Sequence, residues 1–306
     1  MSSMIRRFLL LVLVLGLGLS LHGCFLKSMA VDSIADSLAG TGDTFSSDND
    51  PQLIRESVPF SLKLMESVLS AAPRHVGLLT ALAKGFTEYA YAFVQSDMER
   101  MDDHQYEKKK AWTVRTKNLY LRAQGYGLRG LDVRHEKFSE MLKLDPKGTV
   151  AKANKDDVEL LYWTAVSWLG AIVIDKEDND RMAEEPQAEA LLYRAYELDP
   201  DYDKGSIHDF LITYEGGKPA MMGGSVKKAK EHFDRALVLN KGLDATTYVN
   251  YAEAVDEKEQ NKQEFEDMLN KALAIDPDQE PSNRLVNLLM QERARWLLAN
   301  EDKLFL

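Results

Sequence analysis

The sequence predicts an all-α protein whose helices pack in pairs and stack into a curved array. Two observations support this prediction. Segments with a similar pattern recur along the chain, and most of them end in proline. No stretch alternates apolar and polar residues regularly enough to indicate a strand. The recurring segments are residues 67–73, 140–146, 194–200, 235–241 and 271–277.

The last three segments share a register that the helix period explains. Five, eight and twelve residues before the final position they carry Ala, then a large apolar residue, then a small or apolar one. Steps of three and four place these side chains on one face of a helix, and a following proline ends it. This is the pattern of the second helix of a tetratricopeptide repeat. The positions are Ala195, Leu192 and Ala188; Ala236, Phe233 and Ala229; and Ala272, Leu269 and Phe265, with degenerate sets at Val68, Met65 and Ser61 and at Met141, Phe138 and Arg134.

The helical part is expected to begin at Pro51, because Asp50 is a good N-cap and proline suits the first helical position. Residues 104–133 indicate one long helix or two. Asp156 with Glu159 indicates a capping-box variant at the start of the next helix. The recurring segments lie further apart than the roughly 34 residues of a standard repeat, so we expect longer helices and loops, closed by a last helix at residues 282–299.

The N-terminal residues are similar to a bacterial lipoprotein signal peptide. Arg6 and Arg7 precede an apolar run at residues 8–21, which is shorter than the roughly 20 residues that span a bilayer. The run ends in LHGC, and Cys24 is the only cysteine of the 306 residues. We therefore expect acylation of Cys24. The alternative is an ordinary signal peptide with an incidental cysteine.

Three parts follow from this reading of the N-terminus. We expect a signal peptide at residues 1–23, a lipidated tether at 24–50 and the helical domain at 51–306. Residues 29–38 have some helical spacing and are candidates to dock onto the domain. The lipid would hold the protein at a membrane in the periplasm, and Phe25 in place of Asp after the cysteine favours the outer membrane over the inner one.

The charge balance excludes one class of partner. The chain has 49 acidic and 38 basic residues, a net charge of −11. An acidic chain repels phosphate backbones, so we expect no nucleic-acid binding. With Cys24 acylated, no thiol remains for a disulfide or a thiolate metal site.

No motif indicates catalysis, a cofactor or a metal. Gly216-Gly217-Lys218 lacks the preceding strand of a phosphate loop, and Pro219 follows it instead of Ser or Thr. No pattern marks a carboxylate as buried with a raised pKa, which general acid catalysis needs. No two histidines lie three or four residues apart, as a helical metal pair requires. The histidines after the expected cleavage site are His75, His104, His135, His208 and His232.

Aromatic side chains are the better candidates for binding. Phe86, Tyr89 and Phe93 share a helix face, whereas Trp163 and Trp168 diverge. Either these rings form the core between repeats, or some of them line a groove or pore that contacts an apolar ligand or a partner. The candidate ligand, pore or partner-binding residues are Phe86, Tyr89, Phe93, Trp163, Trp168, Tyr214, Arg293 and Arg295.

Nearly all of residues 50–306 resembles one family, the T component (TatT) of TRAP transporters associated with a tetratricopeptide protein. The stretches that carry the resemblance are residues 84–95, 158–170, 194–202, 216–224 and 291–306. The loop at 216–224 departs from the family, because it carries Lys218 and Met221-Met222 in place of Leu and Pro. The resemblance implies a periplasmic lipoprotein that forms a homotrimer, pairs with the substrate-binding protein of the transporter and has a pore through each protomer.

The leading hypothesis is a non-catalytic scaffold that binds this substrate-binding protein and relays a ligand, either apolar or a carboxylate with an apolar body. An alternative keeps the fold but assigns an outer-membrane assembly or chaperone role to the lipoprotein. An enzyme is the third alternative, and it would need a polar cleft with acids of shifted pKa.

Overall fold

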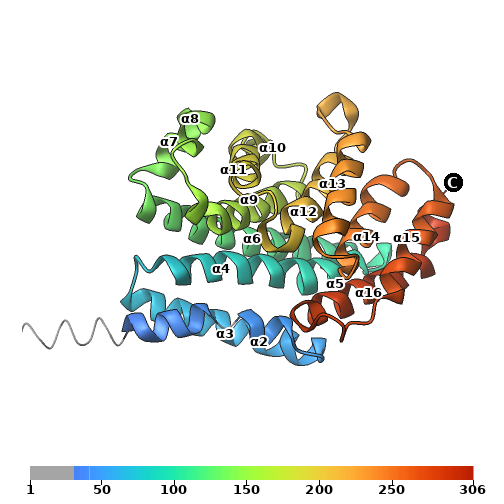
Figure 1. Ribbon diagram of the computed structural model, residues 1–306, viewed down its shortest axis with the longest axis horizontal. Helices are drawn as coiled ribbons and strands as arrows, with labels where there is room; N and C mark the ends of the chain where they lie inside the picture. Colours follow the sequence, from blue (N-terminus) through green and yellow to red (C-terminus); the bar gives the residue numbers. More distant parts are fainter. Residues whose placement is uncertain (1–30, 41, 306) are drawn as a thin grey trace, which may run out of the picture.

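The computed structural model describes residues 31–40 and 42–305, and this part of the chain is almost entirely helical (Figure 1). Residues 31–39 are helical and are followed by short helices, long helices and two π-helical turns, η1 and η6. No strand occurs among the described residues, which confirms the predicted all-α class. The main elements are α2 (Gly42–Ser46), α3 (Pro51–Ala71), α4 (Val76–Tyr89), η1 (Ala90–Gln95), α5 (Ser96–Glu99), α6 (Tyr106–Arg134), α7 (Phe138–Leu144), α8 (Pro146–Val150), α9 (Val158–Val173), α10 (Asn179–Met182), α11 (Glu185–Leu198), α12 (Ser206–Gly217), α13 (Val226–Leu239), α14 (Ala245–Tyr251), η6 (Ala252–Asp256), α15 (Lys262–Ala274) and α16 (Arg284–Ala299).

The predicted helix start at residue 51 is confirmed. The Asp50 carboxylate accepts hydrogen bonds from the backbone N–H of Gln52 and Leu53, at 3.1 and 3.0 Å. Before it, the helical residues 31–39 do dock onto the body. Ala35 is fully buried there, and Asp36 lies 3.1 Å from Nε2 of His75. Cys24 and the expected signal peptide lie outside the described residues.

A single long helix, α6, occupies the stretch that was expected to hold one helix or two. Tyr120 is buried on it, and Trp112, Leu119 and Tyr126 are half-buried. α6 packs against both α4 and α9. The approach to α9 is so close at Gly127 that an added Cβ would lie 2.1 Å from Oγ1 of Thr164. Glycine is therefore required at this crossing.

The prediction that Asp156 and Glu159 form a capping box before α9 is wrong. α9 begins at Val158 without a side-chain cap of its own, and the capping box that is present belongs to the short 3₁₀ turn before it, with Asn154 and Asp157 as its two residues. The Asn154 side chain accepts from the Asp156 N–H at 2.9 Å, and the Asp157 carboxylate accepts from the Asn154 N–H at 2.8 Å. Asparagine caps as well as serine does, and the short 3₁₀ turn at residues 155–157 shifts the helix start.

The nine repeat positions of the last three segments are all buried, none of them more than 4% exposed. They lie on α11, α13 and α15, and all of them except Ala236 belong to the two largest apolar clusters. Met141, from a degenerate set, is 37% exposed, so the register weakens toward the N-terminal half. Helix packing follows the chain in pairs such as α9 with α11, α12 with α13 and α14 with α15. The tetratricopeptide arrangement itself stays a prediction.

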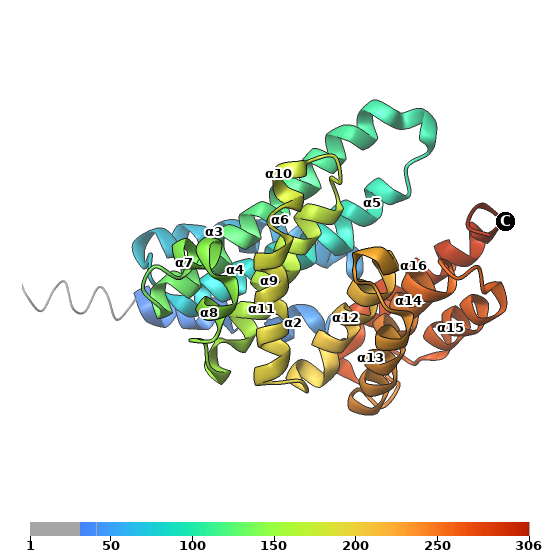
Figure 2. The same cartoon turned by 90° about the horizontal axis from the view of Figure 1, so that it is seen from above.

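The last helix returns to the first ones. α16 contacts α2 and α3 (Figures 1 and 2), and Arg284 donates a 2.8 Å hydrogen bond to the Ser47 carbonyl, 237 residues earlier. We call this contact between the N-terminal helices and α16 the seam. Among the described residues, no helix is long and apolar enough to cross a membrane.

Candidate functional site

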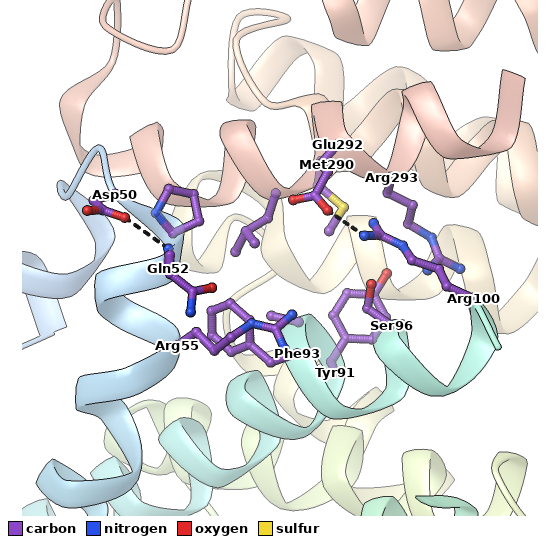
Figure 3. Close-up of a pocket in the computed structure, with 13 residues that line it drawn as sticks. Asp50, Gln52, Arg55, Tyr91, Phe93, Ser96, Arg100, Met290, Glu292 and Arg293 are labelled. Carbon is purple, nitrogen blue, oxygen red and sulfur yellow. Dashed lines mark hydrogen bonds and ion pairs between the residues drawn. The ribbon is translucent and has the colours of Figure 1, made fainter. Parts of the chain in front are cut away.

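A cavity of about 310 Å³ lies at the seam, between the first turns of α3, the π-helical turn η1 with α5, and α16 (Figure 3). Its wall combines the rings of Tyr91 and Phe93 with three arginines, Arg55, Arg100 and Arg293. Concave sites with aromatic walls and a few fixed polar groups are typical binding sites. The cavity is therefore the candidate functional site.

Two π-helical turns shape the surroundings of this cavity. η1 continues α4 without a break and carries Tyr91 and Phe93, while η6 continues α14 and carries Glu253. A π-helical turn inserts one extra residue per turn, so it redirects the side chains that follow, and such turns are frequent at functional sites. Regular helical spacing alone gives no signal for either of them.

Arg293 is the best-fixed charged residue of the site. Its guanidinium donates two hydrogen bonds of 2.7 Å to Glu253 and one of 2.7 Å to Glu99. Its side chain is 14% exposed. Burial by itself lowers the pKa of Arg293, but the negative charge of Glu253 with that of Glu99 outweighs burial and raises it well above its ordinary value. Arg293 is thus a permanent cation that joins α16, η6 and α5.

The other two arginines are paired in the same way across the seam. Arg55 of α3 donates to both carboxylate oxygens of Asp97 in α5, at 2.6 and 2.8 Å, and its guanidinium carbon lies 5.0 Å from the centre of the Phe93 ring. Arg100 forms an ion pair with Glu292 of α16. Each of the three arginines is therefore already paired with a carboxylate from another helical element. The carboxylate of a ligand would have to bind an arginine that also keeps its protein partner.

Tyr91 supplies the polar end of the aromatic wall. Burial, rather than any neighbouring charge, is the main cause that raises the pKa of its hydroxyl to about 12. The hydroxyl therefore stays protonated at neutral pH and can donate a hydrogen bond to a ligand. Phe93 beside it is 5% exposed and offers apolar surface only.

The structure brings only part of the candidate residue set to this cavity. Phe93 and Arg293 line it, and the Tyr89 ring contacts that of Phe93, at 5.7 Å between ring centres. Phe86 lies further along α4 and stacks on Tyr126, with 6.0 Å between the ring centres. Sequence spacing places Phe86, Tyr89 and Phe93 on one helix face, but Phe93 lies two helical turns after Phe86, within η1, and of these two residues only Phe93 lines the cavity.

The remaining candidates lie elsewhere. Trp163 and Trp168 are buried in α9, where Trp168 donates a 2.9 Å hydrogen bond to Glu184. Tyr214 of α12 has its hydroxyl 3.0 Å from Glu185. Arg295 lies two residues after Arg293 on α16, so it points to another side of the helix, and it is exposed. These four residues do not belong to the seam cavity.

Sequence reasoning missed two buried polar clusters. His208 and His232 are 24 residues apart, yet their Nδ1 atoms lie 2.9 Å apart between α12 and α13, beside a second cavity of about 290 Å³. Buried carboxylates with a raised pKa also exist, contrary to expectation. Burial and Asp244 raise the pKa of Asp209, and burial and Glu264 raise that of Asp256 to about 8. Tertiary packing brings these groups together, which helical spacing could not reveal.

The buried Asp209 carboxylate holds helices together and does not line the seam cavity. Asp209 accepts a 2.6 Å hydrogen bond from Thr247, which itself accepts one of 2.8 Å from Asn240, so these three residues join α12 to α13 and α14. Within residues 31–40 and 42–305, no group of three His, Cys, Asp or Glu side chains is arranged to hold a metal ion.

The described residues thus form an all-helical protein in which α3, η1, α5 and α16 enclose a charged, aromatic cavity. The sequence comparisons make the class specific. The chain belongs to the family of TRAP transporter T-components (TAtT), which it matches over residues 47–305. It is also similar to an uncharacterized protein of Treponema pallidum (strain Nichols), with 29% identity over 302 residues, 93% of this chain and 94% of the relative. The family resemblance drawn from the sequence is confirmed.

Proposed function

We propose that this protein is the non-catalytic scaffold subunit of a TRAP transporter system and that it binds the substrate-binding protein of that system. The family match over residues 47–305 is the observation that carries this proposal. A seam cavity fixed by ion pairs on three sides supports a binding role, because a site whose side chains are already held in place loses little entropy when it binds.

The proposed architecture is a curved stack of tetratricopeptide-type helical pairs. It is supported by nine buried repeat positions in one register on α11, α13 and α15. Stacked helical pairs present extended concave surfaces, and binding is the usual role of such surfaces.

The proposed location is the periplasm, with the lipid on Cys24 holding the protein at the outer membrane. The proposed parts are a signal peptide at residues 1–23, a lipidated tether at 24–50 and the helical domain at 51–306. A single cysteine placed three residues after the end of a short apolar run supports this proposal. A homotrimer with a pore through each protomer is the proposed assembly, and the family resemblance supports it.

The proposed ligand is apolar, or a carboxylate with an apolar body. Phe93 and Tyr91 would contact the apolar body of the ligand. Arg55 or Arg293 would bind the ligand carboxylate in addition to the protein carboxylate with which it is already paired. Tyr89, which contacts Phe93, belongs to the same proposed surface. The roles of Phe86, Trp163, Trp168, Tyr214 and Arg295 stay predictions.

Affinity capture tests the proposal. The full chain, extracted from membranes in mild detergent, should retain the substrate-binding protein of the transporter. A Cys24→Ser variant should leave the membrane fraction and still capture the same partner. Retention of unfolded outer-membrane proteins instead, without the binding protein, would contradict this function and favour the assembly role.

A further inference from the structure

The first part of α6 is basic, although the chain as a whole is acidic. Residues 106–118 contain five lysine or arginine residues and one acidic residue, whereas the whole chain has a net charge of −11. We call this segment the α6 tip. Figure 2 shows the tip, together with the loop that links it to α5, projecting from the body of the molecule. Lys117 pairs with Asp175 and Asp178, so Lys108, Lys109, Lys110 and Arg115 are the cations of the tip that can attract a negatively charged surface.

The α6 tip also exposes residue types that are enriched in protein interfaces. Tyr106 is 65% exposed and Val114 is 51% exposed. Lys108, Lys110 and Arg115 are exposed on the same stretch of helix. Tyrosine and arginine are enriched among the residues that dominate binding energies, so Tyr106 and Arg115 are the residues of this stretch that favour a contact surface.

The base of the tip is held firmly to the body. Lys117 makes 2.7 Å contacts with both Asp175 and Asp178, and Thr113 donates to Sδ of Met98 at 3.2 Å. One turn further on, Tyr120 donates a 2.6 Å hydrogen bond to Gln95. These contacts pin α6 on two sides. The tip is therefore preformed and would lose little conformational entropy on binding.

The direction of α6 favours a protein partner over a lipid surface. At its C-terminal end, Arg129 donates a 3.3 Å hydrogen bond to the Pro73 carbonyl, beside the turn where His75 meets Asp36. The described chain begins at this end, with the helical residues 31–39 that follow the predicted lipid site. A helix of 29 residues extends roughly 40 Å at 1.5 Å per residue. The tip thus lies at the end of α6 that faces away from the expected anchor.

We propose that the α6 tip is a docking surface for an acidic face of a soluble protein partner. The proposal rests on the proposed function, in which this partner is the substrate-binding protein of the transporter. Lysine and arginine steer an acidic surface toward the tip, and Tyr106 and Val114 supply the apolar contact.

The test compares charge reversal at the tip with the same charge change elsewhere. The full chain in detergent carries Lys108→Glu, Lys110→Glu and Arg115→Glu together. The matched control replaces three exposed lysines of the α7–α8 region, Lys143, Lys147 and Lys152. Affinity for the substrate-binding protein is measured at low and high salt, and circular dichroism checks the fold of both variants.

The tip variant should bind at least tenfold more weakly than the wild type and with less dependence on salt, whereas the control should lose less than threefold. Equal affinity of the wild type, the tip variant and the control would overturn the inference and leave the proposed function standing. A wild type that binds no such partner would contradict the proposed function instead.

A second probe tests the tip independently of that partner. Poly-L-glutamate should bind the wild type at low salt and bind the tip variant much more weakly, again with the control unchanged. Failure of the wild type to bind poly-L-glutamate would overturn the inference. So would binding to anionic vesicles of phosphatidylcholine and phosphatidylglycerol that the tip variant loses while poly-L-glutamate binding is absent.

Discussion

Arg293 donates two hydrogen bonds of 2.7 Å to Glu253, so α16 is held to the π-helical turn η6, 40 residues earlier in the chain. The same guanidinium reaches Glu99 at 2.7 Å, 194 residues away. A single side chain therefore joins segments from both ends of the chain beside the seam cavity. Several testable consequences depend on this and on three other buried contacts.

Replacing Arg293 with Met should destabilise the fold, because the half-buried Glu253 and Glu99 would lose their cation. Removal of one partner from a fully buried ion pair costs about 3–5 kcal/mol, and the partial exposure of these carboxylates reduces the expected loss to about 2–3 kcal/mol. Urea unfolding followed by circular dichroism measures the loss. Arg295→Met is the matched control on the same helix, and it should change the free energy of unfolding little, since Arg295 is exposed. Similar losses in both variants would contradict the role of the Arg293 pairs.

Gly127 should not tolerate a methyl group, because an added Cβ would meet Oγ1 of Thr164 at 2.1 Å and its Cβ at 2.9 Å. We expect Gly127→Ala to reduce the free energy of unfolding by about 1–3 kcal/mol through overpacking. Gly125→Ala lies on the same helix with nothing within 4 Å of the added carbon. It should stabilise the protein by about 0.5–1 kcal/mol. Thermal melts of the two variants should therefore shift in opposite directions.

The histidine pair should make stability depend on acid pH. Burial, and then the proximity of His232, lowers the pKa of His208 to about 4, and burial also lowers the pKa of His232. An unfolded histidine has a pKa of roughly 6.5. Between the folded and the unfolded pKa, the unfolded chain binds more protons than the folded one. Acidification therefore lowers the free energy of unfolding, by up to about 1.4 kcal/mol for each histidine and each pH unit.

The variant His208→Gln isolates this effect. Its free energy of unfolding, measured in urea across the acid range, should fall less steeply with pH than that of the wild type. His104→Gln is the control, because His104 is exposed. Identical slopes for the wild type and His208→Gln would show that the pair is not the source of the pH dependence.

Asp256 should affect stability in the opposite direction. Burial, together with Glu264, raises the pKa of Asp256 to about 8, far above its ordinary value of 3.8. Between these values the folded chain binds the extra proton, so the free-energy cost of keeping the folded carboxyl protonated grows as pH rises. Asp256→Asn should therefore match the wild type near about pH 4 and become increasingly more stable up to about pH 8. Exposed Asp267 supplies the control, Asp267→Asn, which should follow the wild type throughout.

Local signals in the sequence predict the helices well. Asp50 with Pro51 marks the start of α3, and the apolar steps of three and four residues mark the buried faces of α11, α13 and α15. Both signals depend on neighbours within a few turns of the same helix. The capping residues before α9 are not predicted, because Asn154 and Asp157 cap a short 3₁₀ turn that precedes the helix.

The candidate site was predicted only in part. The sequence predicts Phe93 and Arg293 as binding residues, because they are an aromatic and a basic residue within stretches that carry the family resemblance. Both line the cavity. Arg55, Glu99 and Glu253 were not found, since their pairing depends on α3, α5, η6 and α16 meeting at the seam. Helical periodicity also assumes regular turns, so it does not predict the π-helical turn η1 that carries Phe93.

The claim at the centre of this account is that the chain binds the substrate-binding protein of a TRAP transporter. Isothermal titration of the full chain in detergent with that purified protein tests it most directly. We predict a saturable heat of binding with micromolar affinity or tighter, at a fixed ratio of partner to chain. A titration without heat of binding, together with separate elution of the two proteins in size exclusion, would contradict the claim.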